Sequence, residues 1–459
     1  MSRADLHALC IAHPCLGSLA EPLLYSAIEF TFRERKPHQS HTPPIGVTLL
    51  VGNLLRRPER AAYVRTISCT KGDPPRTGWH GKVPKIPVHE SDLHEALSFV
   101  GNTRLSYRDT WMDELRNGTL DAYLAVLLSQ LPRLRHLHLG PVFFVESDLI
   151  GLVLRSILCD SHLGQLMPGV GTSLHQLQTV TLERDRGREK DIRKIRNTEN
   201  VLPFFHLPSL REMSVSVDDP LVPVVPRPTT QPPSALGLVS LRLTKIRESH
   251  LGHLLSAAPR LRSLHWWWYF DPDFEDRFNT PVVNLDQFMP ALAHVRDTLT
   301  ELSIPAYCAY ANWVAIPFPM RVQGSLKALA GFEQLKRLLI PLMFFTGFSL
   351  PVREKLGNCL PRNLEELTLT DDLSTDNDLN EEWHLEATHT HAIGTWLEDV
   401  ETSTPRLRKL CLVLQNPDIY VGFDIIDARN KIRELTRRAG IELKVEEVYN
   451  MEFEGWELS

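Results

Sequence analysis

The sequence predicts an α/β solenoid in which short parallel strands alternate with helical or irregular segments. A motif of leucine, two variable residues, leucine, one variable residue and another apolar residue returns between residues 134 and 412. Between the motifs, several stretches carry apolar residues at helical spacing. Units of this kind cannot bury their apolar edges without their neighbours, so they stack into one continuous core.

The motif residues are expected to point into the core as one ladder, because side chains alternate along a strand. Their spacing is uneven and mostly exceeds the roughly 20 to 29 residues of regular leucine-rich repeats, so the repeats are degenerate. We therefore expect a leucine-rich-repeat-like solenoid with a parallel concave β-sheet and a helical or irregular convex side. The motif triplets are Leu134, Leu137, Leu139; Leu177, Val180, Leu182; Leu210, Met213, Val215; Leu238, Leu241, Leu243; Leu261, Leu264, Trp266; Leu299, Leu302, Ile304; Leu335, Leu338, Ile340; Leu364, Leu367, Leu369; and Leu407, Leu410, Leu412.

Individual elements follow from local signals. Helical spacing predicts helices over residues 149–156 and 285–295, each lying between two motifs. Near the end of the chain, Asp424 can cap a helix, and Gly440 suits the position just past its C-terminus. The alternating apolar residues of 441–445 then predict a last strand that caps the array.

Three insertions into the solenoid are expected as loops on its surface. One near residues 183–200 is charged, one near 218–234 is rich in proline, and one near 269–281 is aromatic and acidic. The proline-rich insertion could be a polyproline ligand for an adaptor domain, although a flexible loop explains the same residues.

Composition excludes several classes of protein. With 43% hydrophobic and 23% charged residues, the chain has the make-up of a globular protein. A net charge of -6 provides no general field for nucleic acid or an anionic membrane. No apolar run reaches the roughly 18 to 20 residues of a membrane helix. The seven cysteines are scattered and form no CxxC pair, which argues against a disulfide framework. These features predict a cytoplasmic or nuclear protein.

No catalytic motif is present. The sequence lacks GxSxG, the phosphate-binding GxxxxGK[ST] and a GxGxxG after a strand. The polar stretch around His389 and His391 has no metal-site spacing. We therefore predict no enzyme, no cofactor and no metal, although a hydrolase with an unrecognised site is a third reading of the chain.

The N-terminal residues carry a family resemblance. Residues 5–32 predict a short helix, a turn, a second helix and a strand. This stretch, with its segment LAEPLLYSAIEF, resembles the closing half of an F-box in fungal F-box proteins. Residues 53–68 resemble the linker and first strand of that family. An F-box normally opens with a leucine-proline-glutamate segment that does not precede this stretch, so we expect an incomplete, N-terminally truncated F-box.

The resemblance implies a domain plan and a function. Residues 1–32 would be a partial F-box-like helical cap, and residues 33–459 the repeat solenoid. The protein would be the substrate-binding subunit of a ubiquitin ligase, with Skp1 and cullin as partners. Leu6, Leu9 and Leu16 could remain from the adaptor contact, or they could pack on the first repeat. The alternative function is a repeat scaffold without adaptor binding.

Residues between the motif positions should face outward and form the candidate protein-binding surface. Trp266 and Trp268 should replace core leucines, whereas Trp267 should face outward as an apolar anchor. Two other readings remain: Trp267 could be covered by the nearby insertion, and the sheet face could bind nothing. The candidate residues are His136, His138, Glu183, Arg242, His265, Trp267, Glu301, Arg337, Glu366 and Lys409.

Overall fold

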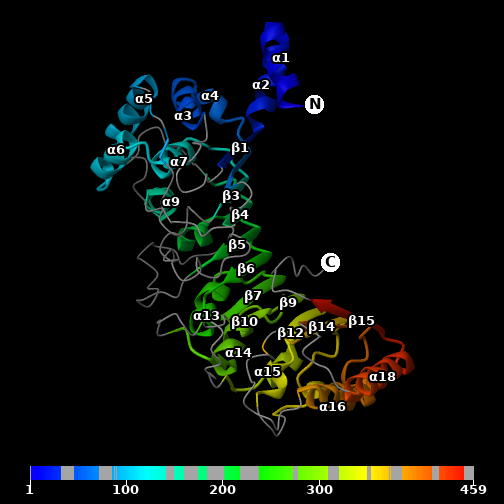
Figure 1. Cartoon of the computed structure of the whole chain (residues 1–459). Coiled ribbons are helices and arrows are strands. Elements are labelled where there is room, and N and C mark those ends of the chain that lie inside the picture. Colours follow the sequence, from blue (N-terminus) through cyan, green and yellow to red (C-terminus); the bar gives the residue numbers. More distant parts are fainter. Residues whose placement is uncertain are drawn as a thin grey trace. The chain divides into compact units, whose positions relative to one another are not determined.

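A computed structural model of the chain gives a mixed α/β fold with parallel strands (Figure 1). The chain divides into two compact units. The first comprises residues 1–218 and 223–238, and the second comprises residues 219–222 and 239–459. The described residues are 2–32, 46–71, 85–86, 88, 90–140, 149–159, 174–182, 201–217, 237–271, 278–308, 320–348, 353–371, 373, 385–415 and 423–448.

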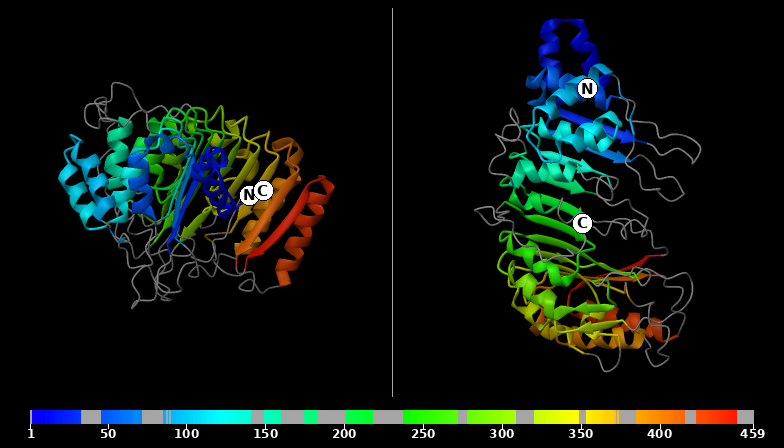
Figure 2. Two further views of the ribbon diagram at one scale, coloured as in Figure 1. Left: turned by 90° about the horizontal axis from the view of Figure 1, so that it is seen from above. Right: turned by 90° about the vertical axis from the view of Figure 1, so that its left-hand side faces the viewer.

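In the first unit, strands β1 to β5 form a parallel sheet in sequence order. Helices α5, α6, α7 and α9 lie together on one side of this sheet (Figures 1 and 2). The elements are α1 Arg3–Ala12, α2 Pro14–Ser26, β1 Ala27–Phe32, α3 Val47–Arg56, α4 Pro58–Ala61, β2 Thr66–Lys71, α5 Glu90–Gly101, α6 Arg108–Arg116, α7 Leu120–Ser129, β3 His136–Leu139, α9 Leu149–Cys159, β4 Thr179–Leu182, a 3-10 turn Leu202–His206 and β5 Glu212–Ser216.

In the second unit, the parallel order is β6, β7, β9, β12, β13, β14 and β15, with β10 also pairing with β7. A separate parallel pair joins β8 and β11. The elements are β6 Ser240–Thr244, α13 Glu248–Ser256, β7 Ser263–Phe270, β8 Val282–Asn284, α14 Leu285–Ala293, β9 Glu301–Ser303, β10 Ala306–Cys308, β11 Arg321–Gln323, β12 Arg337–Pro341, α15 Met343–Thr346, β13 Glu366–Thr370, α16 Leu385–Glu398, α17 Val400–Ser403, β14 Lys409–Gln415, α18 Phe423–Arg438 and β15 Glu442–Val448, with 3-10 turns Lys327–Gly331 and Leu356–Asn358.

The motif residues align in register, as the alternation predicted. In the first unit, Leu137 pairs with Ile67 on β2 and with Val180 on β4. In the second unit, one row runs through Leu241, Leu264, Leu302, Leu338, Leu367, Leu410 and Leu443. The row residues from Leu241 to Leu410 are at most 1% exposed. The predicted parallel pairing and the buried motif leucines are confirmed within each unit.

Several predicted elements are also confirmed. The N-terminal order of helix, helix and strand is present as α1, α2 and β1, and the helices ahead of the motifs are present as α9 and α14. The last strand, β15, pairs parallel with β14. Gly440 has a φ of +68°, a left-handed conformation that glycine adopts without strain.

Two local predictions are wrong. Residues 53–56 belong to helix α3 rather than to a linker, because Val47, Val51 and Leu54 lie on one face and are buried. Asp424 lies inside α18, which begins at Phe423, so it does not occupy the capping position. The second error places the start of a helix too late.

The predicted insertions fall largely outside the described residues. This holds for all of 183–200 and all of 218–234. Of 269–281, the structure describes 269–271 and 278–281, and β7 continues through Phe270. Within the described part of the chain, no helix is both long and apolar enough to cross a membrane.

Candidate functional site

One outward row of the second unit carries charges of alternating sign, and we call it the charge row. Register places its members on five neighbouring strands. Arg337 Nη2 lies 3.0 Å from Glu301 Oε2 on the adjacent strand. Because neighbouring charges of opposite sign compensate each other, this row presents polar groups with little net charge. Its members are Glu301, Arg337, Glu366, Lys409 and Glu442.

Within the charge row, Arg337 interacts with several neighbouring glutamates. Its hydrogen bond to Glu301 raises the pKa of the guanidinium, and the charges of Glu301, Glu366 and Glu365 act in the same direction against partial burial. Its Nε is nevertheless buried without a hydrogen-bond partner among the described residues. A buried donor of this kind can donate a hydrogen bond to a carbonyl or carboxylate of a bound chain.

The outward face is less open than alternation predicts. In the next outward row, Ser303, Leu339 and Cys411 are 3%, 2% and 7% exposed. β9, β12 and β14 therefore bury outward residues as well, as in many parallel sheets, whereas Thr368 on β13 is half-buried and Lys444 on β15 is exposed. Among the predicted surface residues of this unit, Glu301, Arg337, Glu366 and Lys409 of the charge row are half-buried.

Arg242 and His265 are register partners on β6 and β7. Arg242 is exposed, whereas His265 is half-buried. Burial, followed by the nearby positive charge of Arg242, lowers the pKa of His265 to about 4. The imidazole is therefore neutral at physiological pH and offers one donor and one acceptor.

The tryptophan run follows the predicted register. Trp266 and Trp268 are fully buried, whereas Trp267 between them is half-buried. Trp266 donates from Nε1 to the carbonyl of Ile246 at 2.9 Å and stacks on Phe288 with ring centroids 4.7 Å apart. The core role predicted for Trp266 and Trp268 is confirmed, and Trp267 keeps part of its ring accessible.

Trp268 belongs to a buried ionic network that the sequence did not predict. Its Nε1 donates to Glu248 Oε1 at 2.9 Å, and Arg247 Nε donates to Glu248 Oε2 at 3.0 Å. The Arg247 guanidinium also lies 4.8 Å over the Trp268 ring and donates to the carbonyl of Val282. Oε1 of Glu248 accepts a second bond from the backbone of Asn284. In the sequence, only the adjacent opposite charges of Arg247 and Glu248, soon after a motif strand, indicated this network.

In the first unit, the outward face has a different chemistry. His136 is exposed and His138 is half-buried, both on β3. Register places Thr66 and Thr179 beside His136, with hydroxyl residues at the corresponding positions beside His138. This face offers hydroxyl and imidazole groups. The remaining predicted residue, Glu183, lies outside the described residues.

The N-terminal hairpin of α1 and α2 exposes apolar side chains. Leu6 is 8% exposed and Leu9 is half-buried, so packing within the hairpin accounts for Leu6. On α2, Leu16, Leu19 and Leu23 are 42%, 72% and 56% exposed. Their spacing of three and four residues places them on one helix face, which we call the leucine stripe. The predicted Leu16 belongs to this stripe, whereas Leu6 does not.

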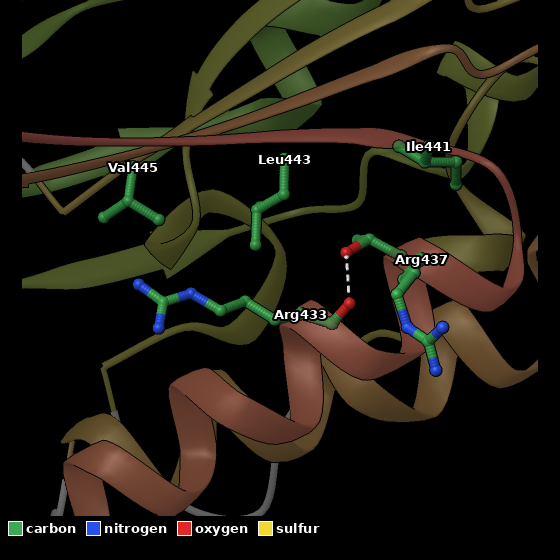
Figure 3. A pocket seen from close by; sticks show the side chains of 6 residues that line it. Arg433, Arg437, Ile441, Leu443 and Val445 are labelled. Atoms are coloured by element: carbon green, nitrogen blue, oxygen red, sulfur yellow. Dashed lines mark hydrogen bonds between the residues drawn. The ribbon is translucent and has the colours of Figure 1, made fainter.

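An open groove lies at the C-terminal end of the second unit, between α18 and the last strand β15 (Figure 3). Leu443 and Val445 point from the strand toward the helix, and Thr436 Oγ1 donates to the Arg433 carbonyl at 3.1 Å. Arg437 is held in an ion pair with Glu434 at 2.9 Å. The lining mixes apolar side chains with two arginines and the hydroxyl of Thr436.

No group of three or more metal-ligating side chains occurs among the described residues. The side chain of His389 is outside that set, and His391 is exposed. Comparison of the chain with protein-family models and with curated proteins found no match.

Proposed function

We propose that the chain is a non-enzymatic protein-recognition module, the substrate-binding, F-box-like subunit of a ubiquitin ligase. In this proposal the strands and their connections form a leucine-rich-repeat-like solenoid that holds the substrate. The N-terminal hairpin docks on the Skp1 adaptor, which links it to cullin. Such a subunit would work in the cytoplasm or nucleus, without nucleic acid or membrane as ligand.

The observation that carries this proposal is the leucine stripe. Leu19 and Leu23 are more than half exposed, although Ala20 on the same helix is buried. Exposed apolar residues gathered on one helix face are typical of a protein contact, because scattered single residues would need no partner. Arg3 donates to the carbonyl of Ala27, which ties the hairpin to the start of β1.

The substrate side of the proposal rests on the charge row and Trp267. A surface with paired charges, one spare guanidinium donor and a partly exposed indole suits a polypeptide better than a lipid. Trp267 would supply the apolar anchor, and the charge row, level with Ser263 at the start of β7, would supply hydrogen bonds to the same partner.

The test is co-purification of the tagged full chain with Skp1 and cullin from cells. The double change Leu19→Asp with Leu23→Asp should abolish recovery of both, because carboxylates in an apolar contact remain desolvated and unpaired. Leu49→Asp is the matched control, since Leu49 is a 55% exposed leucine on α3. It should leave recovery unchanged. Failure of the parent chain to recover Skp1 would favour a repeat scaffold without a ubiquitin role.

A further inference from the structure

Arginines gather at the start of the parallel strands in the first unit. Backbone bonds of 2.8 Å run from the Arg135 amide to the Arg65 carbonyl, from the Gln178 amide to the Arg135 carbonyl, and from the Arg211 amide to the Gln178 carbonyl. These residues therefore stand at one level, each directly ahead of its strand. Arg133 joins them, because Arg65 Nη1 donates to its carbonyl at 3.4 Å. We call Arg65, Arg133, Arg135 and Arg211 the arginine row.

The arginine row has no ion-pair partner among the residues that the structure describes. None of its members forms an ion pair with a carboxylate in the part of the chain that the structure describes. Arg133, Arg135 and Arg211 are exposed, and Arg65 is half-buried. Partial burial and the charges of Arg135 and Arg133 lower the pKa of Arg65. Guanidinium groups stay protonated in proteins, so the cluster keeps a repulsion that an anionic ligand would relieve.

The same level in the second unit includes a carboxylate. Backbone bonds of 2.8 to 2.9 Å link Arg262, Thr300, Lys336, Glu365 and Arg408 in the same way. Here Lys336 Nζ lies 3.0 Å from Glu365 Oε1. The hydrogen bond from Lys336 and the charges of Lys336, Arg408 and Arg406 lower the pKa of Glu365. The basic residues at this level of the second unit therefore lie beside a carboxylate, whereas the described carboxylates form no ion pair with the arginine row.

We propose that the arginine row binds an acidic, extended segment of a protein partner. This inference rests on the recognition function proposed above and names the chemistry of one ligand. Neighbouring strands stand about 4.8 Å apart, so Arg65 and Arg211, three strands apart, span about 14 Å. Residues on one side of an extended chain repeat about every 6.6 Å, so an acidic stretch of about five residues matches this length.

The charge of the molecule favours a peptide over nucleic acid. A net charge of -6 repels a long polyanion, whereas a short acidic segment meets only the local arginines. Arginine forks also match carboxylates in bidentate geometry.

The test titrates the full chain with a fluorescein-labelled octaglutamate peptide and follows fluorescence anisotropy. The variant Arg133→Glu with Arg135→Glu should weaken binding at least about tenfold, because two charge-assisted contacts become repulsive. Arg406→Glu with Arg408→Glu is the matched control, since both pairs occur in the sequence Pro-Arg-Leu-Arg. It should bind within about threefold of the parent, as expected for charges outside the contact. Thermal unfolding checks that both variants fold.

Three outcomes would overturn the inference: no binding of the peptide by the parent chain, equal weakening in both variant pairs, or tighter binding of polyuridylate RNA than of octaglutamate. Skp1 recovery separates this test from that of the proposed function. The Arg133 and Arg135 variant should recover Skp1 normally, whereas the variant of the leucine stripe should bind octaglutamate normally. Each failure can therefore be assigned to one claim.

Discussion

Trp268 and Glu248 are both buried, and the indole Nε1 donates to the carboxylate at 2.9 Å. The same carboxylate accepts from Arg247, whose guanidinium lies over the indole ring. A buried ion pair gains little over an apolar core, but removing one partner leaves a buried charge uncompensated. Removal of one partner from this network should therefore cost more stability than loss of an exposed ion pair.

Glu248→Ala should lower the free energy of unfolding by about 3 to 5 kcal/mol, because it removes the carboxylate that pairs with the Arg247 charge and accepts from the Trp268 indole. Urea unfolding followed by circular dichroism measures the loss. Glu333→Ala, at an exposed glutamate, should change it by less than about 0.5 kcal/mol. Equal stability of the two variants would show that the network carries no stability.

Leu264→Ala and Leu367→Ala should each cost about 2 to 5 kcal/mol, because both side chains are at most 1% exposed in the motif row. Thermal and urea unfolding of the two variants measure the cost. A loss below about 1 kcal/mol at both positions would contradict a closely packed core.

Trp267→Ala should weaken the binding of a captured partner by about 2 kcal/mol, roughly thirtyfold, because a partly exposed indole is a common interface anchor. The melting temperature should change little. Trp266→Ala should instead lower the melting temperature, because that indole is fully buried. If the Trp267 variant binds as the parent does, the indole is not an anchor.

Stability should fall as the pH is lowered from about 6.5 toward 4, in part through His265. Its folded pKa of about 4 lies below the unfolded value of 6.5, so the unfolded state takes up a proton first. The contribution of His265 is complete above pH 6.5 and is lost as the pH falls through the folded pKa. His265→Gln should flatten this part of a plot of urea midpoint against pH. An unchanged slope would assign the pH dependence to other groups.

The alternation of strand motifs with helical segments was sufficient to predict the parallel strands, and the period-2 pattern predicted the buried leucines and the different burial of Trp266 and Trp267. That pattern could not predict that Ser303 and Leu339 are buried, because alternation says which face a residue joins and not whether that face is covered. The pair Arg247 and Glu248 also escaped prediction, since its partners Trp268 and Asn284 meet it only through tertiary packing.

The arginine row could not be predicted from the sequence for a related reason. Arg65 and Arg211 are far apart in sequence, and only the strand register brings them to one level. The leucine stripe was partly visible, because Leu16 lies in the predicted helix. Its other members depended on knowing which side of α2 packs against α1.

The most direct test of the central claim is calorimetric titration of the purified full chain with purified Skp1. The proposed function predicts saturable binding of one Skp1 per chain, lost in the Leu19→Asp, Leu23→Asp variant and kept in Leu49→Asp. Absence of binding by the parent chain, or equal binding by all three proteins, would contradict it.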